Sequence, residues 1–138
     1  VTAETGPHYL LREYKDMEQV GPLLKMNPPV RSRDHAEVLW DGLLNGYVDM
    51  IATDHSPHTL EEKGSDLYGK MTKPAIWDCI SGFCGVETAV PVLLTEVNKG
   101  RMTLNHRGSS RAFISGITAS VRSGWMCRYA LRPGAFPP

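Results

Sequence analysis

The chain has 138 residues, of which 41% are hydrophobic, so it is long enough for one ordinary domain and too apolar for a disordered segment. Its 15 basic and 15 acidic residues cancel, and this balance gives no indication of a nucleic-acid or acidic-membrane partner. The charges are unevenly placed. Residues 1–96 contain every acidic residue and carry a net charge of −7, whereas residues 97–138 carry +7, so the two parts look like different kinds of sequence.

The cysteine content and the length of the apolar runs favour a cytoplasmic protein. Cys79, Cys84 and Cys127 are too few for a disulfide framework and lack the spacing of a zinc ribbon or finger, which favours reduced thiols. No apolar run approaches the length of a membrane span. The chain shows no signal peptide and starts abruptly at Val1 in a strand-like pattern, so we expect a fragment of a longer cytoplasmic protein.

The first predicted element is a strand over residues 1–5, where β-branched residues alternate before Gly6 and a proline end the pattern. We expect His8, which follows, to be structural, with a direct catalytic role as the alternative. Residues 25–31, Lys-Met-Asn-Pro-Pro-Val-Arg, predict a rigid extended loop, because two prolines restrict its backbone. Asn27 in this loop offers both a donor and an acceptor, a combination that suits the amide or imide edge of a ring.

A helix is predicted between Ser32, a good N-cap residue, and Gly46, a typical stop. Its apolar residues have the spacing of an amphipathic stripe and are Ala36, Leu39, Trp40 and Leu43. We expect Trp40 to lie in the core. A short buried strand is predicted over residues 48–52, and the order strand, helix, strand favours a βαβ unit with a parallel sheet.

The polar residues after the second strand are the strongest functional signal. We expect Asp54 at the carboxyl end of the strand, where parallel α/β proteins place reacting groups, with His55 and His58 on the next loop. Three interpretations fit these residues. Asp54 is a metal ligand and proton acceptor while His58 contacts substrate; or Asp54, His55 and His58 form a self-contained metal site; or Asp54 caps a turn and the histidines are surface groups.

Residues 59–78 are polar and irregular, which predicts a long loop, and residues 61–63, Glu-Glu-Lys, are expected to form a solvated face of it. A second helix is predicted over residues 86–97, where apolar residues recur at helical spacing. Pro91 is tolerable there only near the first turn or at a kink.

Four stretches together resemble one family. Residues 53–59, Thr-Asp-His-Ser-Pro-His-Thr, and the following Glu-Glu-Lys resemble the strand-eight motif of cyclic amidohydrolases, and of dihydroorotases in particular. Residues 1–10 resemble the family's strand-seven segment, and residues 25–31 resemble its Asn-Pro-Pro-Leu-Arg loop. Residues 81–88, Ser-Gly-Phe-Cys-Gly-Val-Glu-Thr, resemble the segment that closes over the substrate. The resemblance implies an α/β fold for residues 1–104, namely the last two βα units of a (β/α)8 barrel.

The resemblance also implies a function. Dihydroorotases hydrolyse dihydroorotate reversibly to N-carbamoyl-aspartate in pyrimidine biosynthesis, with one or two zinc ions. Asp54 would touch a metal and act as the catalytic proton acceptor, and His55 would orient a neighbouring group. The substrate contacts implied by the matched motifs are Asn27, His58, Ser81 and Gly82.

Several expectations qualify this function. The family's His-x-His pair is absent from this sequence, and its other metal ligands lie on earlier strands, so we expect the isolated chain to be inactive. Allantoinase and hydantoinase, which share the fold and metals, are the nearest alternatives. A non-catalytic dihydroorotase-like subunit bound to an aspartate transcarbamoylase is the alternative from another class. A homo-oligomer is also compatible with the sequence, whereas nucleic-acid and membrane partners are not expected.

The resemblance ends near residue 104. Residues 105–138 are rich in Arg, Ser, Gly and Pro and contain no acidic residue, a composition typical of an out-of-frame reading of a GC-rich gene. We expect an irregular, non-family basic tail that is frameshifted or disordered. A basic nucleic-acid arm is the alternative, but the arginines are dispersed rather than clustered.

Overall fold

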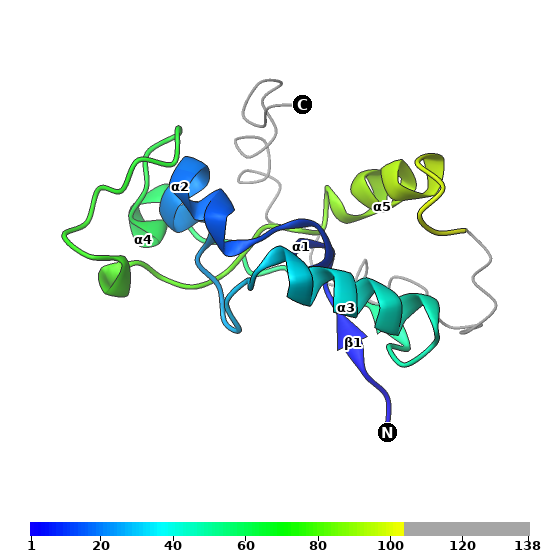
Figure 1. The fold of residues 1–138 in the computed structure, drawn as a ribbon. Coiled ribbons are helices and arrows are strands. Elements are labelled where there is room, and N and C mark those ends of the chain that lie inside the picture. The colour runs from blue at the N-terminus through cyan, green and yellow to red at the C-terminus, as the bar shows by residue number, and fades with distance from the viewer. Residues whose placement is uncertain (104–138) are drawn as a thin grey trace.

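The computed structural model describes residues 1–103, which form a mixed arrangement of short strands and helices (Figure 1). The tail predicted for residues 105–138 lies outside the described residues. Strand β1 (Glu4–Thr5) pairs in parallel with β2 (Met50–Ile51), with Glu4 opposite Met50 and Thr5 opposite Ile51. The parallel βαβ unit predicted from the sequence is therefore confirmed.

Both strands are shorter than predicted. The ladder ends after Thr5 because Gly6 and Pro7 turn the chain into helix α1 (Pro7–Leu11), and proline has no N–H to continue the pairing. At the other end, the N–H of Asp49 donates to the carbonyl of Ala3. Two strands form an open sheet, so closing a barrel would require strands from outside the described residues.

The two predicted helices are confirmed as α3 (Arg33–Leu44) and α5 (Ala89–Asn98). Pro91 is the third residue of α5, in the first turn, where a missing N–H costs no helical hydrogen bond. Ser32 occupies the N-cap position of α3, but its side chain does not cap the helix. Its Oγ instead lies 2.8 Å from Nδ1 of His35, while the predicted position of Ser32 at the N-cap is confirmed.

Short helical turns connect these elements. The α-helical turns are α2 (Met17–Val20) and α4 (Leu60–Lys63), and the 3-10 turns are η1 (Tyr14–Asp16), η2 (Gly21–Leu24) and η3 (Ile76–Asp78). In Figure 1, α2 and α4 lie at the left of the view and α5 at the right, with α3 below α5. Among residues 1–103, no helix combines the length and apolar character needed to span a membrane.

The main core forms where α3 packs on α1 and the sheet. Trp40 is only 2% exposed, which confirms its predicted burial, and its Nε1 donates to the carbonyl of Leu10 at 2.9 Å. The buried members of this cluster are Leu10, Trp40, Leu43, Ile51 and Leu93. Each such side chain contributes on the order of 2 kcal/mol by leaving water. A second cluster, of Leu24, Met26 and Val30, supports the loop that carries Asn27.

The prediction of an irregular, solvated loop over residues 59–78 is partly wrong. Thr59 and Glu62 form a capping box that starts α4: Thr59 Oγ1 accepts from the Glu62 N–H, and the Glu62 carboxylate accepts from the Thr59 N–H. This turn directs Lys63 inward, where it is 5% exposed. Gly64 ends the turn with φ at 63°, in the left-handed region that glycine adopts at low cost.

Candidate active site

Four of the predicted site residues line one cavity of about 180 Å³, namely Asn27, Asp54, Ser81 and Gly82. They come from three separate stretches: the loop after η2, the end of β2 and the segment after η3. Met26, Ser56 and Phe83 complete the lining. The volume is below the ~300–1,000 Å³ usual for small-molecule sites. The individual roles predicted for them stay predictions.

Asp54 stands three residues after β2, with an exposed side chain and a backbone φ of 46°. Few residues other than glycine occupy this left-handed region, although aspartate tolerates it better than most, and such positions concentrate at functional sites. The negative charge of Asp54 acts on two neighbours. Burial and, secondarily, this charge raise the pKa of Tyr9. Burial lowers the pKa of His8 to about 4, and the charge of Asp54 opposes that shift.

His8 is buried, as expected of a structural histidine. Its ring lies tilted against those of Tyr9 and Phe83, with centroids 4.2 Å and 5.5 Å away. Its Nε2 has no hydrogen-bond partner among the described residues. Burial in this environment favours the neutral form of the ring.

His55 is hydrogen-bonded to the loop that follows the cavity residue Gly82. Its Nδ1 accepts from the N–H groups of Gly85 at 3.1 Å and Val86 at 3.3 Å, which assigns the ring proton of the neutral form to Nε2. The adjacent N–H of Ser56 donates to the carbonyl of Phe83. His55 therefore holds the segment that follows Gly82 against the end of β2, consistent with the orienting role implied for it.

His58 is not among the residues that line this cavity, although it is next to two of them, Ser56 and Gly82. Its Nε2 is 3.3 Å from Oγ of Ser56, and its Nδ1 is 3.7 Å from the carboxylate of Glu62. A Cβ at Gly82 would lie 2.7 Å from Cδ2 of His58, so Gly82 and the imidazole are in direct contact. The substrate contact predicted for His58 stays a prediction, whereas Ser56, which sequence reasoning passed over, is in the lining.

The donor set does not fit a complete metal centre. Within residues 1–103, no group of three or more His, Cys, Asp or Glu side chains is arranged to hold a metal ion. The interpretation of Asp54, His55 and His58 as a self-contained metal site is therefore wrong. Nδ1 of His55 is occupied by backbone amides, and His58 faces Ser56 and Glu62. Asp54 remains a chemically suitable single carboxylate ligand.

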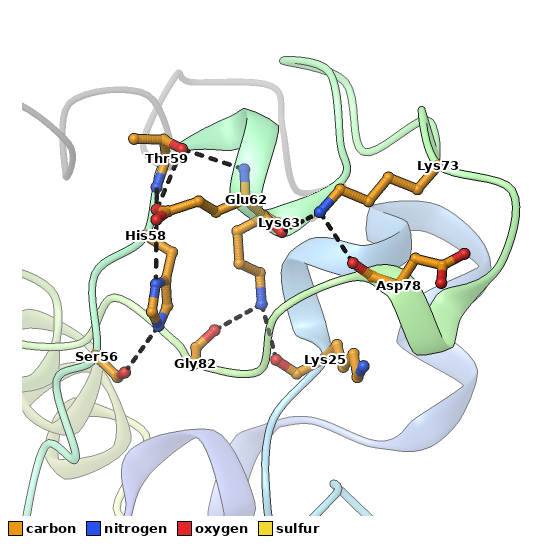
Figure 2. A network of polar contacts seen from close by, with 9 residues as sticks. All are labelled: Lys25, Ser56, His58, Thr59, Glu62, Lys63, Lys73, Asp78 and Gly82. Atoms are coloured by element: carbon orange, nitrogen blue, oxygen red, sulfur yellow. Dashed lines mark hydrogen bonds and ion pairs between the residues drawn. The ribbon is translucent and has the colours of Figure 1, made fainter.

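Sequence reasoning also missed Lys63. Its Nζ donates to main-chain carbonyls on two of the stretches that form the cavity, those of Lys25 and Gly82 (Figure 2). The available signal was the Thr-x-x-Glu pattern of residues 59–62, which predicts a capped helical turn there instead of irregular chain.

Comparison with curated proteins identifies the relatives of this region. A dihydroorotase from Bacillus cytotoxicus is 48% identical over 105 residues, which cover 75% of this chain and 22% of that protein. A dihydroorotase from Halobacterium salinarum is 41% identical over 102 residues, covering 74% of this chain and 22% of that protein. The matched region is homologous to dihydroorotases. No family model matches the chain.

Solved structures extend this dihydroorotase homology to the wider amidohydrolase superfamily. An L-hydantoinase (dihydropyrimidinase) from Arthrobacter aurescens matches with a TM-score of 0.67 and 39% identity, covering 77% of this chain and 22% of that chain. A D-hydantoinase from a Thermus species matches with a TM-score of 0.63 and 29% identity, with 76% and 22% covered. The chain thus spans about a fifth of the length of the relatives it matches.

Proposed function

We propose that residues 1–103 are a segment of a metal-dependent cyclic amidohydrolase that hydrolyses dihydroorotate reversibly to N-carbamoyl-aspartate. The observation that carries this proposal is the meeting of Asn27, Asp54, Ser81 and Gly82 around one cavity in a dihydroorotase-like region. Three stretches remote in sequence supply these residues, and each matches a dihydroorotase motif. In the parent protein, this segment would be the last two βα units of a (β/α)8 barrel.

In this proposal Asp54 is the proton carrier. The oxygen of a water molecule adds to the ring carbonyl carbon, and the water proton passes to the Asp54 carboxylate. The carbon–nitrogen bond then breaks, and Asp54 returns the proton to the leaving ring nitrogen. Asn27 pairs with the imide edge of the ring, Ser81 and Gly82 present polar backbone to it, and His58 serves the substrate carboxylate.

The metal requirement makes the isolated chain inactive in this proposal. Asp54 would supply one oxygen ligand to a zinc centre of one or two ions, and the remaining ligands would come from polypeptide outside residues 1–103. That part of the parent protein would also enlarge the cavity to the size of the substrate. Activity therefore belongs to the complete enzyme.

A chimeric enzyme tests the function. Residues 1–103 replace the homologous segment of the Bacillus cytotoxicus dihydroorotase, which is 48% identical over this region. We expect the purified chimera to hydrolyse dihydroorotate, and an Asp54→Asn variant to lose about 1,000-fold or more in kcat. Asp49→Asn, a change in an acidic residue of the chain just before β2, is the matched control and should retain activity.

A chimera that is folded by circular dichroism and gel filtration but hydrolyses no cyclic amide would overturn the proposal. It would favour a non-catalytic dihydroorotase-like subunit instead, and co-purification with an aspartate transcarbamoylase would then be the next measurement. Equal activity of the Asp54→Asn variant would remove the proposed proton carrier while leaving the substrate assignment intact.

Hydantoinase activity is the second candidate, favoured by the 39% identity to the L-hydantoinase structure. The two activities differ in substrate, since hydantoin lacks the carboxylate that dihydroorotate carries. The chimera and the complete parent enzyme should therefore be assayed on dihydroorotate, hydantoin and allantoin. A kcat/KM at least tenfold higher for hydantoin would replace the dihydroorotase proposal.

A further inference from the structure

Lysine side chains, together with backbone hydrogen bonds from the N–H groups of Ile80 and Gly82, hold the segment from Ile76 to Gly82 in place. Lys25 Nζ donates to the carbonyls of Ile76, at 2.8 Å, and Cys79. Lys63 Nζ donates to the carbonyls of Lys25 at 2.8 Å and Gly82 at 2.7 Å. Figure 2 shows the Lys63 ammonium group between these two carbonyls, with its side chain running down from α4.

Lys63 is an unusual residue for such a place. It is 5% exposed, and it forms no ion pair with a carboxylate in the part of the chain that the structure describes. Burial lowers the pKa of its amine to about 8. A buried amine without an acidic partner costs stability unless hydrogen bonds satisfy it, so an apolar side chain would be the simpler choice for packing alone.

The two carbonyls that Lys63 binds belong to two of the stretches that form the cavity. The Lys25 carbonyl stands two residues before Asn27, and Gly82 itself lines the cavity. The same Lys25 carbonyl also accepts from the N–H of Gly82 at 3.0 Å. Lys63 therefore adds a second, side-chain bridge to one backbone hydrogen bond and sets the separation of the two stretches.

We propose that Lys63 is a positioning residue that sets substrate affinity by holding the Gly82 wall against the Asn27 loop. This inference rests on the proposed function for its kinetic consequence. Lys63 touches neither the cavity nor Asp54, so its loss should change how the substrate is held more than how the proton is moved.

Lys63→Met in the chimera tests the kinetic consequence, because methionine keeps much of the length and removes the donors. We expect KM for dihydroorotate to rise at least tenfold and kcat to stay within threefold. Lys63→Gln, which retains an N–H donor, should recover part of the KM. Lys70→Met is the control and should change neither constant, because the side chain of Lys70 is exposed and makes no hydrogen bond to residues 76–82.

Hydrogen exchange in the full chain gives a readout independent of activity. The peptide that contains Gly82 should exchange at least tenfold faster in Lys63→Met than in the parent chain, and Lys70→Met should leave that peptide unchanged. If the chimera hydrolyses no cyclic amide, the proposed function fails and exchange alone decides the positioning role. Unchanged exchange in Lys63→Met, or a loss of kcat with KM unchanged, would overturn the inference. If Lys63→Met does not fold, the same comparisons apply to Lys63→Gln.

Discussion

Gly82 is the residue whose backbone most tightly restricts the cavity wall. Its φ is +147°, and a Cβ there would lie 2.7 Å from His58 Cδ2 and 2.8 Å from the carbonyl oxygen of Ser56. Both the backbone conformation and the surrounding atoms therefore exclude a larger residue. Because His58, Ser56 and the lysine bridge all meet at Gly82, displacement of this residue should disturb several proposed substrate contacts together.

We predict that Gly82→Ala lowers kcat/KM of the chimera for dihydroorotate by about 100-fold or more, since a misplacement of about 1 Å has costs of this order. Gly100→Ala is the control. Gly100 also has a positive φ, of +75°, but a Cβ there meets no atom of residues 1–103 within 4 Å. Near-parental kinetics in the Gly82 variant would show that the wall tolerates displacement and that the contact with His58 is unimportant.

His8 provides a prediction about acid sensitivity. The unfolded chain takes up a proton on this histidine near pH 6.5, whereas burial lowers the pKa in the folded chain to about 4. The unfolded state therefore binds more protons between these values, so stability falls as the pH drops from about 6.5 to about 4. The loss from this group is at most about 3 kcal/mol.

Urea unfolding of the full chain at several pH values measures this loss. His8→Phe, which keeps a ring beside Tyr9 and Phe83, should flatten the acid side of the stability profile. An identical slope in the parent chain and the variant would mean that His8 is not the group responsible.

At the scale of elements, the two helix starts offer a matched comparison. Thr59 Oγ1 accepts from the N–H of Glu62 at 3.1 Å, whereas Ser32 stands at the same position of α3 with its hydroxyl engaged by His35. We predict that Thr59→Ala costs about 1 kcal/mol of the free energy of unfolding, the usual worth of an N-cap. Ser32→Ala should cost clearly less.

Chemical denaturation of the two variants is the measurement. Because α4 carries Lys63 into the interior, Thr59→Ala should also accelerate hydrogen exchange of the Gly82 peptide, and Ser32→Ala should not. If both variants lost the same free energy of unfolding, this would contradict the inference that only the Thr59 side chain caps its helix.

At the scale of the whole molecule, we expect the described residues to form one wall of a larger site. They contribute an open pair of parallel strands, a partial cavity and one exposed carboxylate, and they span about a fifth of the relatives' length. Open strand edges favour association with other strands. In the proposed parent enzyme, the neighbouring barrel strands would occupy these edges and bring the other metal ligands beside Asp54.

Metal titration of the isolated chain tests this incompleteness. We predict that zinc binding curves of the parent chain and of Asp54→Ala, measured by calorimetry, are indistinguishable, because residues 1–103 hold no group of three ligands. In the chimera, by contrast, Asp54→Ala should weaken zinc binding at least tenfold. A tenfold effect already present in the isolated chain would show that Asp54 belongs to a local metal site after all.

The sequence alone determined the features that depend on near neighbours and on recognisable motifs. Helical periodicity predicted α3 and the burial of Trp40. The strand–helix–strand order predicted the parallel pairing of β1 and β2. The motif resemblance singled out Asn27, Asp54, Ser81 and Gly82, although it could not measure their proximity. Tertiary structure decided the rest. Lys63 lies in the interior because carbonyls from residues 25 and 82 converge on its amine, and no local pattern encodes a partner 38 residues away. Nδ1 of His55 accepts from backbone amides for the same reason: its partners at residues 85 and 86 reach it only through the fold.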